Sequence, residues 1–112
     1  MSPQDEALAG RIRRSLAARR DVVERRMFGG GAFMVRGHMA CGTVRDRLMV
    51  RLGDAGSAAA LKERHVQPMD FTGKVVKSMV FVRQEGIRTS KALKEWLDRA
   101  LAFNATLEKR RE

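Results

Sequence analysis

The sequence predicts an α+β domain in which helices pack on an antiparallel sheet of about four to five strands. Two observations lead to this prediction. The two ends of the chain carry amphipathic helical patterns, whereas the middle carries short, apolar, strand-like segments separated by turn residues. The length of 112 residues suits one domain, residues 1–112, and no repeat or linker divides it.

The first helix is expected from Ser2 to about Arg20. Ser2 suits the N-cap and Pro3 suits the first turn, while Leu8, Ile12 and Leu16 form one apolar stripe. The arginines of this helix are candidate contacts for a polyanion, and they are Arg13, Arg14, Arg19 and Arg20. Arg13 and Arg20 fall on one flank of the stripe and Arg14 on the other, whereas Arg19 lies close to the stripe itself. An ordinary solvated surface is therefore the preferred interpretation.

Three strands are expected next, at residues 32–35, 39–44 and 48–52, because apolar and other residues alternate there. Arg36-Gly37 and Asp46-Arg47 are short enough to be hairpin turns, so these strands should be consecutive and antiparallel. A short alanine-rich helix should follow, capped by Asp54 and running to about Arg64, with Ala58 and Leu61 facing inward.

The last third of the chain predicts a strand and a helix. His65–Thr72 contains Pro68 and is expected to be a loop or an edge strand, followed by a strand over Lys74–Arg83 and a turn at residues 84–86. The final helix should open at Thr89 or Ser90, and residues 108–112 should fray. Its buried face is predicted to consist of Leu93, Trp96, Leu97, Ala100, Leu101 and Asn104.

The run Gly29, Gly30 and Gly31 predicts a structural bend. Each glycine loses much backbone entropy on ordering, so three in succession indicate a bulge, a strained turn or a close backbone approach. The alternative, a phosphate-binding loop, would need a following helix. Because a strand is expected there, a bend is the preferred interpretation.

The methionines predict an interaction surface. Met34 and Met49 lie in strands whose two faces are both partly apolar, so the helices would leave one apolar face uncovered. Unbranched methionine side chains adapt to irregular partners, although filling the core is the common alternative. We therefore expect a protein partner on this face, or a homodimer formed through it.

Composition and charge narrow the class of protein. The net charge of +10 is distributed along the chain, with seven basic and four acidic side chains in residues 1–26 and six and four in residues 89–112. Such a surface attracts polyanions without reading their sequence, so any nucleic-acid binding should be non-specific. The single cysteine, the polar start and the lack of a long apolar run predict a cytoplasmic protein that contacts no membrane.

The residues suited to catalysis or metal binding form no recognisable pattern. Cys41 with His38 and His65 lacks the spacing of a zinc site. Asp46, Asp70 and Glu85 are spread over turns and form no general acid–base pair. We therefore expect no enzyme, no catalytic residue, no cofactor, no metal and no small-molecule substrate.

Four segments resemble one known family in order and spacing: MFGG at residues 27–30, LMVRL at 48–52, MDFTGK at 69–74 and LKEWLDRALAF at 93–103. Together they resemble the N-terminal domain of the TfoX/Sxy family. The resemblance implies an α+β domain from bacterial regulators of competence genes. Longer members carry a second, helical C-terminal domain, and the chain is expected to be a stand-alone N-terminal domain. Ala32 stands where the family usually has glycine.

The resulting prediction is a non-enzymatic regulatory or adaptor domain that acts through protein–protein contact, as the resemblance to transcription and competence regulators implies. The alternative is a non-specific nucleic-acid-binding protein with a diffuse basic surface. The low aromatic content argues against this alternative, because few side chains could stack on bases.

Overall fold

The computed structural model describes residues 2–27, 29–71 and 73–110, and over them the chain folds into one antiparallel sheet with three α-helices. The predicted α+β class is confirmed. The sheet has six strands in the order β1-β2-β3-β4-β6-β5. The elements are α1 (Pro3–Ser15), β1 (Val22–Met27), β2 (Gly30–Val35), β3 (His38–Val44), β4 (Arg47–Arg51), α2 (Gly53–Ala60), β5 (Val66–Phe71), β6 (Lys74–Val82), the 3-10 turn η1 (Gln84–Gly86) and α3 (Ser90–Asn104).

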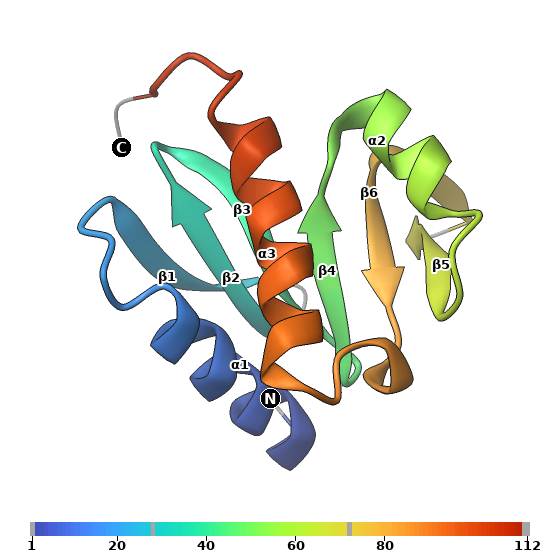
Figure 1. Ribbon diagram of the computed structural model, residues 1–112, viewed down its shortest axis with the longest axis horizontal. Helices are drawn as coiled ribbons and strands as arrows, with labels where there is room; N and C mark the ends of the chain where they lie inside the picture. The colour runs from blue at the N-terminus through green and yellow to red at the C-terminus, as the bar shows by residue number, and fades with distance from the viewer. Residues whose placement is uncertain (1, 28, 72, 111–112) are drawn as a thin grey trace.

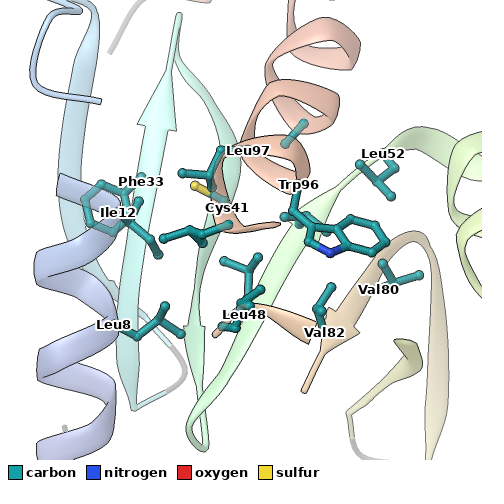
Figure 2. Close-up of a cluster of buried hydrophobic side chains, with 14 of the residues drawn as sticks. Leu8, Ile12, Phe33, Cys41, Leu48, Leu52, Val80, Val82, Trp96 and Leu97 are labelled. Carbon is teal, nitrogen blue, oxygen red and sulfur yellow. The ribbon is translucent and has the colours of Figure 1, made fainter. Parts of the chain in front are cut away.

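Helices α1 and α3 pack against the same face of the sheet, with α3 lying across β3 and β4 (Figure 1). The main core fills the space between them. Figure 2 shows Leu8 and Ile12 of α1 and Leu97 of α3 pointing towards Phe33 and Cys41 of the sheet. These side chains are at most 2% exposed, so this face is closed. We refer to it as the helical face.

The predicted N-caps of the two long helices and the predicted first hairpin turn are present. The hydroxyl of Ser2 accepts a hydrogen bond from the Asp5 backbone amide, and that of Thr89 accepts one from the Ala92 amide, so both long helices start where predicted. The first hairpin turn is Arg36-Gly37, with φ of 55° and 82°. Positive φ at both central residues is the geometry that matches strand twist in a two-residue hairpin.

The sheet has one strand more than the four to five predicted, and the two strands that the sequence indicates least clearly, β1 and β5, are at its edges. β1 has exposed side chains at its four central positions, so its sequence lacks the alternation of a half-buried strand. β5 contains Pro68, and its edge position tolerates a residue without an N–H donor. The edge alternative for residues 65–72 is therefore the right one for β5; Thr72 lies outside the described residues.

Three boundaries differ from the predictions. Helix α1 ends at Ser15 instead of about Arg20, and the second hairpin turn lies one residue earlier than expected, at Arg45-Asp46. Both turn residues have positive φ, of 50° and 67°, which lets β4 begin at Arg47.

Helix α2 is shorter than predicted and rotated. It runs from Gly53, whose φ is 77°, to Ala60, and Asp54 forms no cap because it already lies inside the first turn. Ser57 and Ala60 are buried, whereas Ala58 and Leu61 are exposed, so the predicted inward face is wrong. An alanine-rich sequence carries too little contrast between apolar and polar positions to fix the inward face.

The segment after α3, residues 105–110, lies against the β2–β3 turn and is not frayed as predicted. The Arg110 amide donates a 3.0 Å hydrogen bond to the Arg36 carbonyl, and His38 Nε2 donates to the Glu108 carbonyl at 2.6 Å. Arg111 and Glu112 lie outside the described residues. Within the described ranges, none of the helices is long and apolar enough to cross a membrane.

Candidate functional site

The glycine run brings β2 and β3 into close contact. Gly29 has a φ of 77° with open space where a side chain would project, whereas a Cβ on Gly30 would overlap the Thr43 carbonyl. The Gly31 amide donates a 3.1 Å hydrogen bond to Thr43 Oγ1. The first glycine therefore sets the turn, and the second allows the close approach of the neighbouring strand. A strand follows the run, so these amides do not converge at a helix N-terminus.

Met34 lies on the face of the sheet opposite the helices. It pairs with Val23 on β1 and with Met39 on β3, and directly paired residues project to the same side. Its neighbour Phe33 belongs to the core of the helical face. Val23 is 43% exposed, and both methionines are half-buried. We call Val23, Met34 and Met39 the open stripe; its Met39 end also packs against the buried cluster that contains Met49.

Met49 does not lie open, as its predicted role in an interaction surface required. It is 1% exposed and packs in a second core with Val44, Met69 and Phe81. The pairing of β5 with β6 shifts register between Pro68 and Met69, and such a bulge bends a strand pair. The bend allows Met69 to cover Met49, so this part of the sheet covers its own second face.

Arg47 completes this cover. Its guanidinium carbon lies 3.8 Å from the centre of the Phe81 ring, and Nη1 donates a 3.1 Å hydrogen bond to the Gln67 side chain. Partial burial and the nearby Arg45 charge lower the pKa of Arg47 from its usual value. The side chain still carries its charge at neutral pH, because an arginine pKa is normally above 12, and the ring face attracts that charge.

A cleft of about 760 Å³ opens beside the other end of the same face. Three parts of the chain form it: the start of β1, the β2–β3 turn and the segment after α3. In Figure 1 this segment and the loop leading into β1 occupy the same corner of the molecule. We call it the basic cleft, and it is lined by Arg20, Asp21, Val23, Arg36, Gly37, Lys109 and Arg110.

The cleft carries an excess of positive charge. Its carboxylate, Asp21, is paired with Arg19 through two hydrogen bonds of 3.0 and 2.8 Å, and this contact lowers the pKa of Asp21 below its usual value. Arg36 donates to the backbone carbonyl of Asn104 at 2.7 Å, which leaves its charge unneutralised. The three remaining cations, Arg20, Lys109 and Arg110, form no ion pair with any described carboxylate.

The four arginines proposed as polyanion contacts do not form one group. Arg13 pairs with Glu24 at 2.6 Å between α1 and β1, and Arg14 lies beside the start of α3. Arg19 forms an ion pair with Asp21. Of the four arginines, only Arg20 lines the cleft.

The sequence analysis missed the other three cations of the cleft, Arg36, Lys109 and Arg110, because they come from distant parts of the chain. The basic run beginning at Lys109 was a usable signal, but it was assigned to a fraying end.

Cys41 is unsuited to nucleophilic chemistry in this fold. It is buried in the main core, and burial raises the pKa of its thiol to about 12. A thiolate is the reactive form, so the native side chain stays protonated at neutral pH. Within residues 2–27, 29–71 and 73–110, no three histidine, cysteine, aspartate or glutamate side chains are grouped closely enough to hold a metal ion.

A model of the TfoX N-terminal domain matches residues 14–104, which is most of the chain. The chain therefore belongs to the TfoX N-terminal domain family. The matched residues contain the complete sheet and α3, whereas most of α1 and the segment at 105–110 lie outside the match. A search of curated proteins found no match.

Proposed function

We propose that this member of the TfoX N-terminal domain family is a non-enzymatic regulatory or adaptor domain that acts through protein–protein contact. One observation supports the proposal: the open stripe adjoins the basic cleft through their shared residue Val23. A contiguous exposed apolar patch, especially one bordered by polar residues, is a feature of protein interaction sites. The stripe supplies apolar side chains and the cleft supplies cationic ones, and both kinds suit contact with another protein.

The family resemblance gives this contact a biological setting. TfoX/Sxy proteins are linked to the control of competence genes, so we propose that the partner is a component of bacterial transcription regulation. The proposal includes a cytoplasmic location, which the single, buried and unpaired cysteine supports.

Non-specific nucleic-acid binding is the second candidate, and the net charge of +10 favours it. The side chains of Phe33, Phe81 and Trp96 are buried, which leaves these three unable to stack on bases. Such binding would depend on phosphate contacts and weaken steeply with salt. Self-association through the open stripe also remains a prediction.

Site-specific photocrosslinking tests the first candidate. A photoreactive benzoylphenylalanine replaces Val23 in the cleft, and the control carries it at Val75, which is 55% exposed on β6. In cells of the source organism, we expect position 23 to give a discrete adduct that nuclease leaves intact and protease destroys. Nuclease-sensitive adducts would favour the second candidate, an adduct of the chain with itself would favour self-association, and equal adducts at both positions would contradict a specific site.

A further inference from the structure

We propose that the basic cleft and the open stripe together bind an acidic, partly apolar segment of a partner protein. The acidic side chains would lie in the cleft, and the neighbouring apolar side chains would lie on Val23, Met34 and Met39. This inference rests on the proposed function, and it adds the binding site and the chemical class of the ligand.

Charge determines what the cleft can accept. Four cationic side chains line it, and its carboxylate is already neutralised by Arg19 from outside the lining. Carboxylates entering the cleft would gain charge-assisted hydrogen bonds from guanidinium groups, which are roughly twice as strong as neutral ones. The lining therefore favours an anionic ligand.

The size of the cleft favours a segment over a single ion. At about 760 Å³ the open cleft offers room for a ligand much larger than one carboxylate. It is open on one side, so an extended chain could enter and leave it. Val23, which lines the cleft and also begins the stripe, connects the charged part of the site to its apolar part.

Apolar surface next to the cations favours a protein segment as the ligand over the two alternatives, which are nucleic acid and a second copy of this chain. A nucleic-acid backbone would offer no apolar partner to the exposed Val23 and the half-buried Met34. A second copy of this chain would have to place its own basic cleft against the first in a two-fold pairing, because the same surface meets itself. An acidic, partly apolar segment satisfies both halves of the site.

The cleft is also organised before any ligand arrives. The segment that contributes Lys109 and Arg110 is held by two hydrogen bonds: the Arg110 amide donates to the Arg36 carbonyl at 3.0 Å, and the His38 side chain of β3 donates to the Glu108 carbonyl at 2.6 Å. A Cβ on Gly37 would overlap the Arg110 backbone, so glycine at this turn permits the contact. Pre-positioned groups reduce the ordering cost of binding.

The test uses a fluorescein-labelled peptide with a run of glutamates followed by a run of leucines, and a version with glutamine in place of glutamate. Binding is measured by fluorescence anisotropy up to millimolar protein. The cleft variant carries Arg20→Glu with Lys109→Glu. Its matched control carries Lys62→Glu with Lys91→Glu, which changes the net charge equally at exposed positions away from the cleft.

We expect the cleft variant to weaken binding of the glutamate peptide at least about tenfold and the control less than about threefold, because a local charge reversal introduces like-charge contacts. The glutamine peptide should bind at least about tenfold more weakly than the glutamate peptide to the wild type. Val23→Ser should weaken the glutamate peptide severalfold. Thermal melts of all variants check that the fold is retained.

Three results would overturn the inference. Equal weakening by the cleft and control variants would show diffuse electrostatics, and equal binding of the two peptides would show that acidity is irrelevant. Tighter, cleft-dependent binding of an oligothymidylate of the same length would assign the cleft to nucleic acid. A nuclease-resistant protein adduct at position 23, found together with any of these results, would leave the proposed function standing and remove only the acidic ligand.

Discussion

At the β4–β6–β5 end of the sheet, the face turned away from α1 and α3 is closed by the protein's own side chains, including Val44 of β3, whereas around Val23 of β1 and Met34 of β2 the same face is partly open. Met49, Met69 and Phe81 are at most 2% exposed in the closed half. In the open half, Val23 is 43% exposed and Met34 is half-buried. The two halves have similar apolar character but different surroundings.

The difference teaches that a small sheet does not need a helix to bury its second face. In the closed half, the cover consists of the side chains of the second core, including Met69 beyond the β5–β6 bulge, and of Arg47 laid over Phe81. The open half also contains a bulge, between Phe33 and Met34, yet Val23 stays 43% exposed there, and its surface borders the basic cleft. We infer that stability is concentrated in the closed half and that binding uses the open half.

Truncating one apolar side chain in each half gives the strongest test of whether the two halves differ in their contribution to stability. We expect Phe81→Ala to lower the free energy of unfolding by about 4 kcal/mol, because a buried aromatic leaves a cavity. Met34→Ala should cost less than about 1 kcal/mol, since its site is partly open to solvent. Urea denaturation of the two variants measures both values, and similar losses would mean that the open half is as tightly packed as the closed one.

The glycine run tests whether the open half depends on a close backbone approach. Gly30→Val should cost about 3 kcal/mol, because its Cβ would overlap the Thr43 carbonyl and a strand would have to shift. Gly29→Ala is the matched control and should cost about 1 kcal/mol, from positive φ alone. Denaturant melts that show wild-type stability for Gly30→Val would remove the structural argument for the run.

The ionisation of Cys41 reports whether water reaches the core of the helical face. This core can then be compared with the two halves of the opposite face. Burial raises the pKa of its thiol to about 12 in the folded protein, from about 9 for a thiol exposed to water. Above pH 9 the unfolded chain releases this proton while the native chain retains it, so stability falls by up to about 1.4 kcal/mol per pH unit until about pH 12. Unfolding at pH 8 and pH 10 should show a smaller loss in Cys41→Ala, and an identical loss would mean that the thiol is hydrated.

Removing Arg47 from the Phe81 ring should give the smallest loss of stability. The variant tests how much this side chain contributes to the closed half. Arg47→Ala should cost about 1 kcal/mol, because it removes the contact with the Phe81 ring and exposes part of that ring. Arg26→Ala, at an exposed position on β1, should be within about 0.5 kcal/mol of wild type. A thermal melt compares the two, and an unchanged Arg47→Ala protein would show that the bulge alone closes this half.

The sequence predicted those parts of the fold that have strong local signals. The capped, periodic patterns of α1 and α3 placed their starts and buried faces, and the turn residues at Arg36-Gly37 placed the first hairpin. β1 was missed because an exposed edge strand does not alternate, and α2 was placed in the wrong rotation because alanine has little preference for inside or outside.

The candidate site was much less predictable from the sequence. Met34 was identified by its place in an apolar strand, but the burial of Met49 depends on a bulge between Pro68 and Met69 that no local pattern marks. The basic cleft joins residue 20 to residues 36 and 109, so its charges become neighbours only after the segment following α3 folds back. Long-range contacts of this kind leave no spacing in the sequence.

The attachment of residues 105–110 to the hairpin turn has an evolutionary consequence. This segment belongs to no helix or strand, and it contributes two of the four cations of the cleft. Its sequence could diverge with little effect on the sheet, because its described hydrogen bonds to the turn use the backbone of residues 108 and 110. Related proteins could therefore acquire new ligands by exchanging this short segment while inheriting the same scaffold.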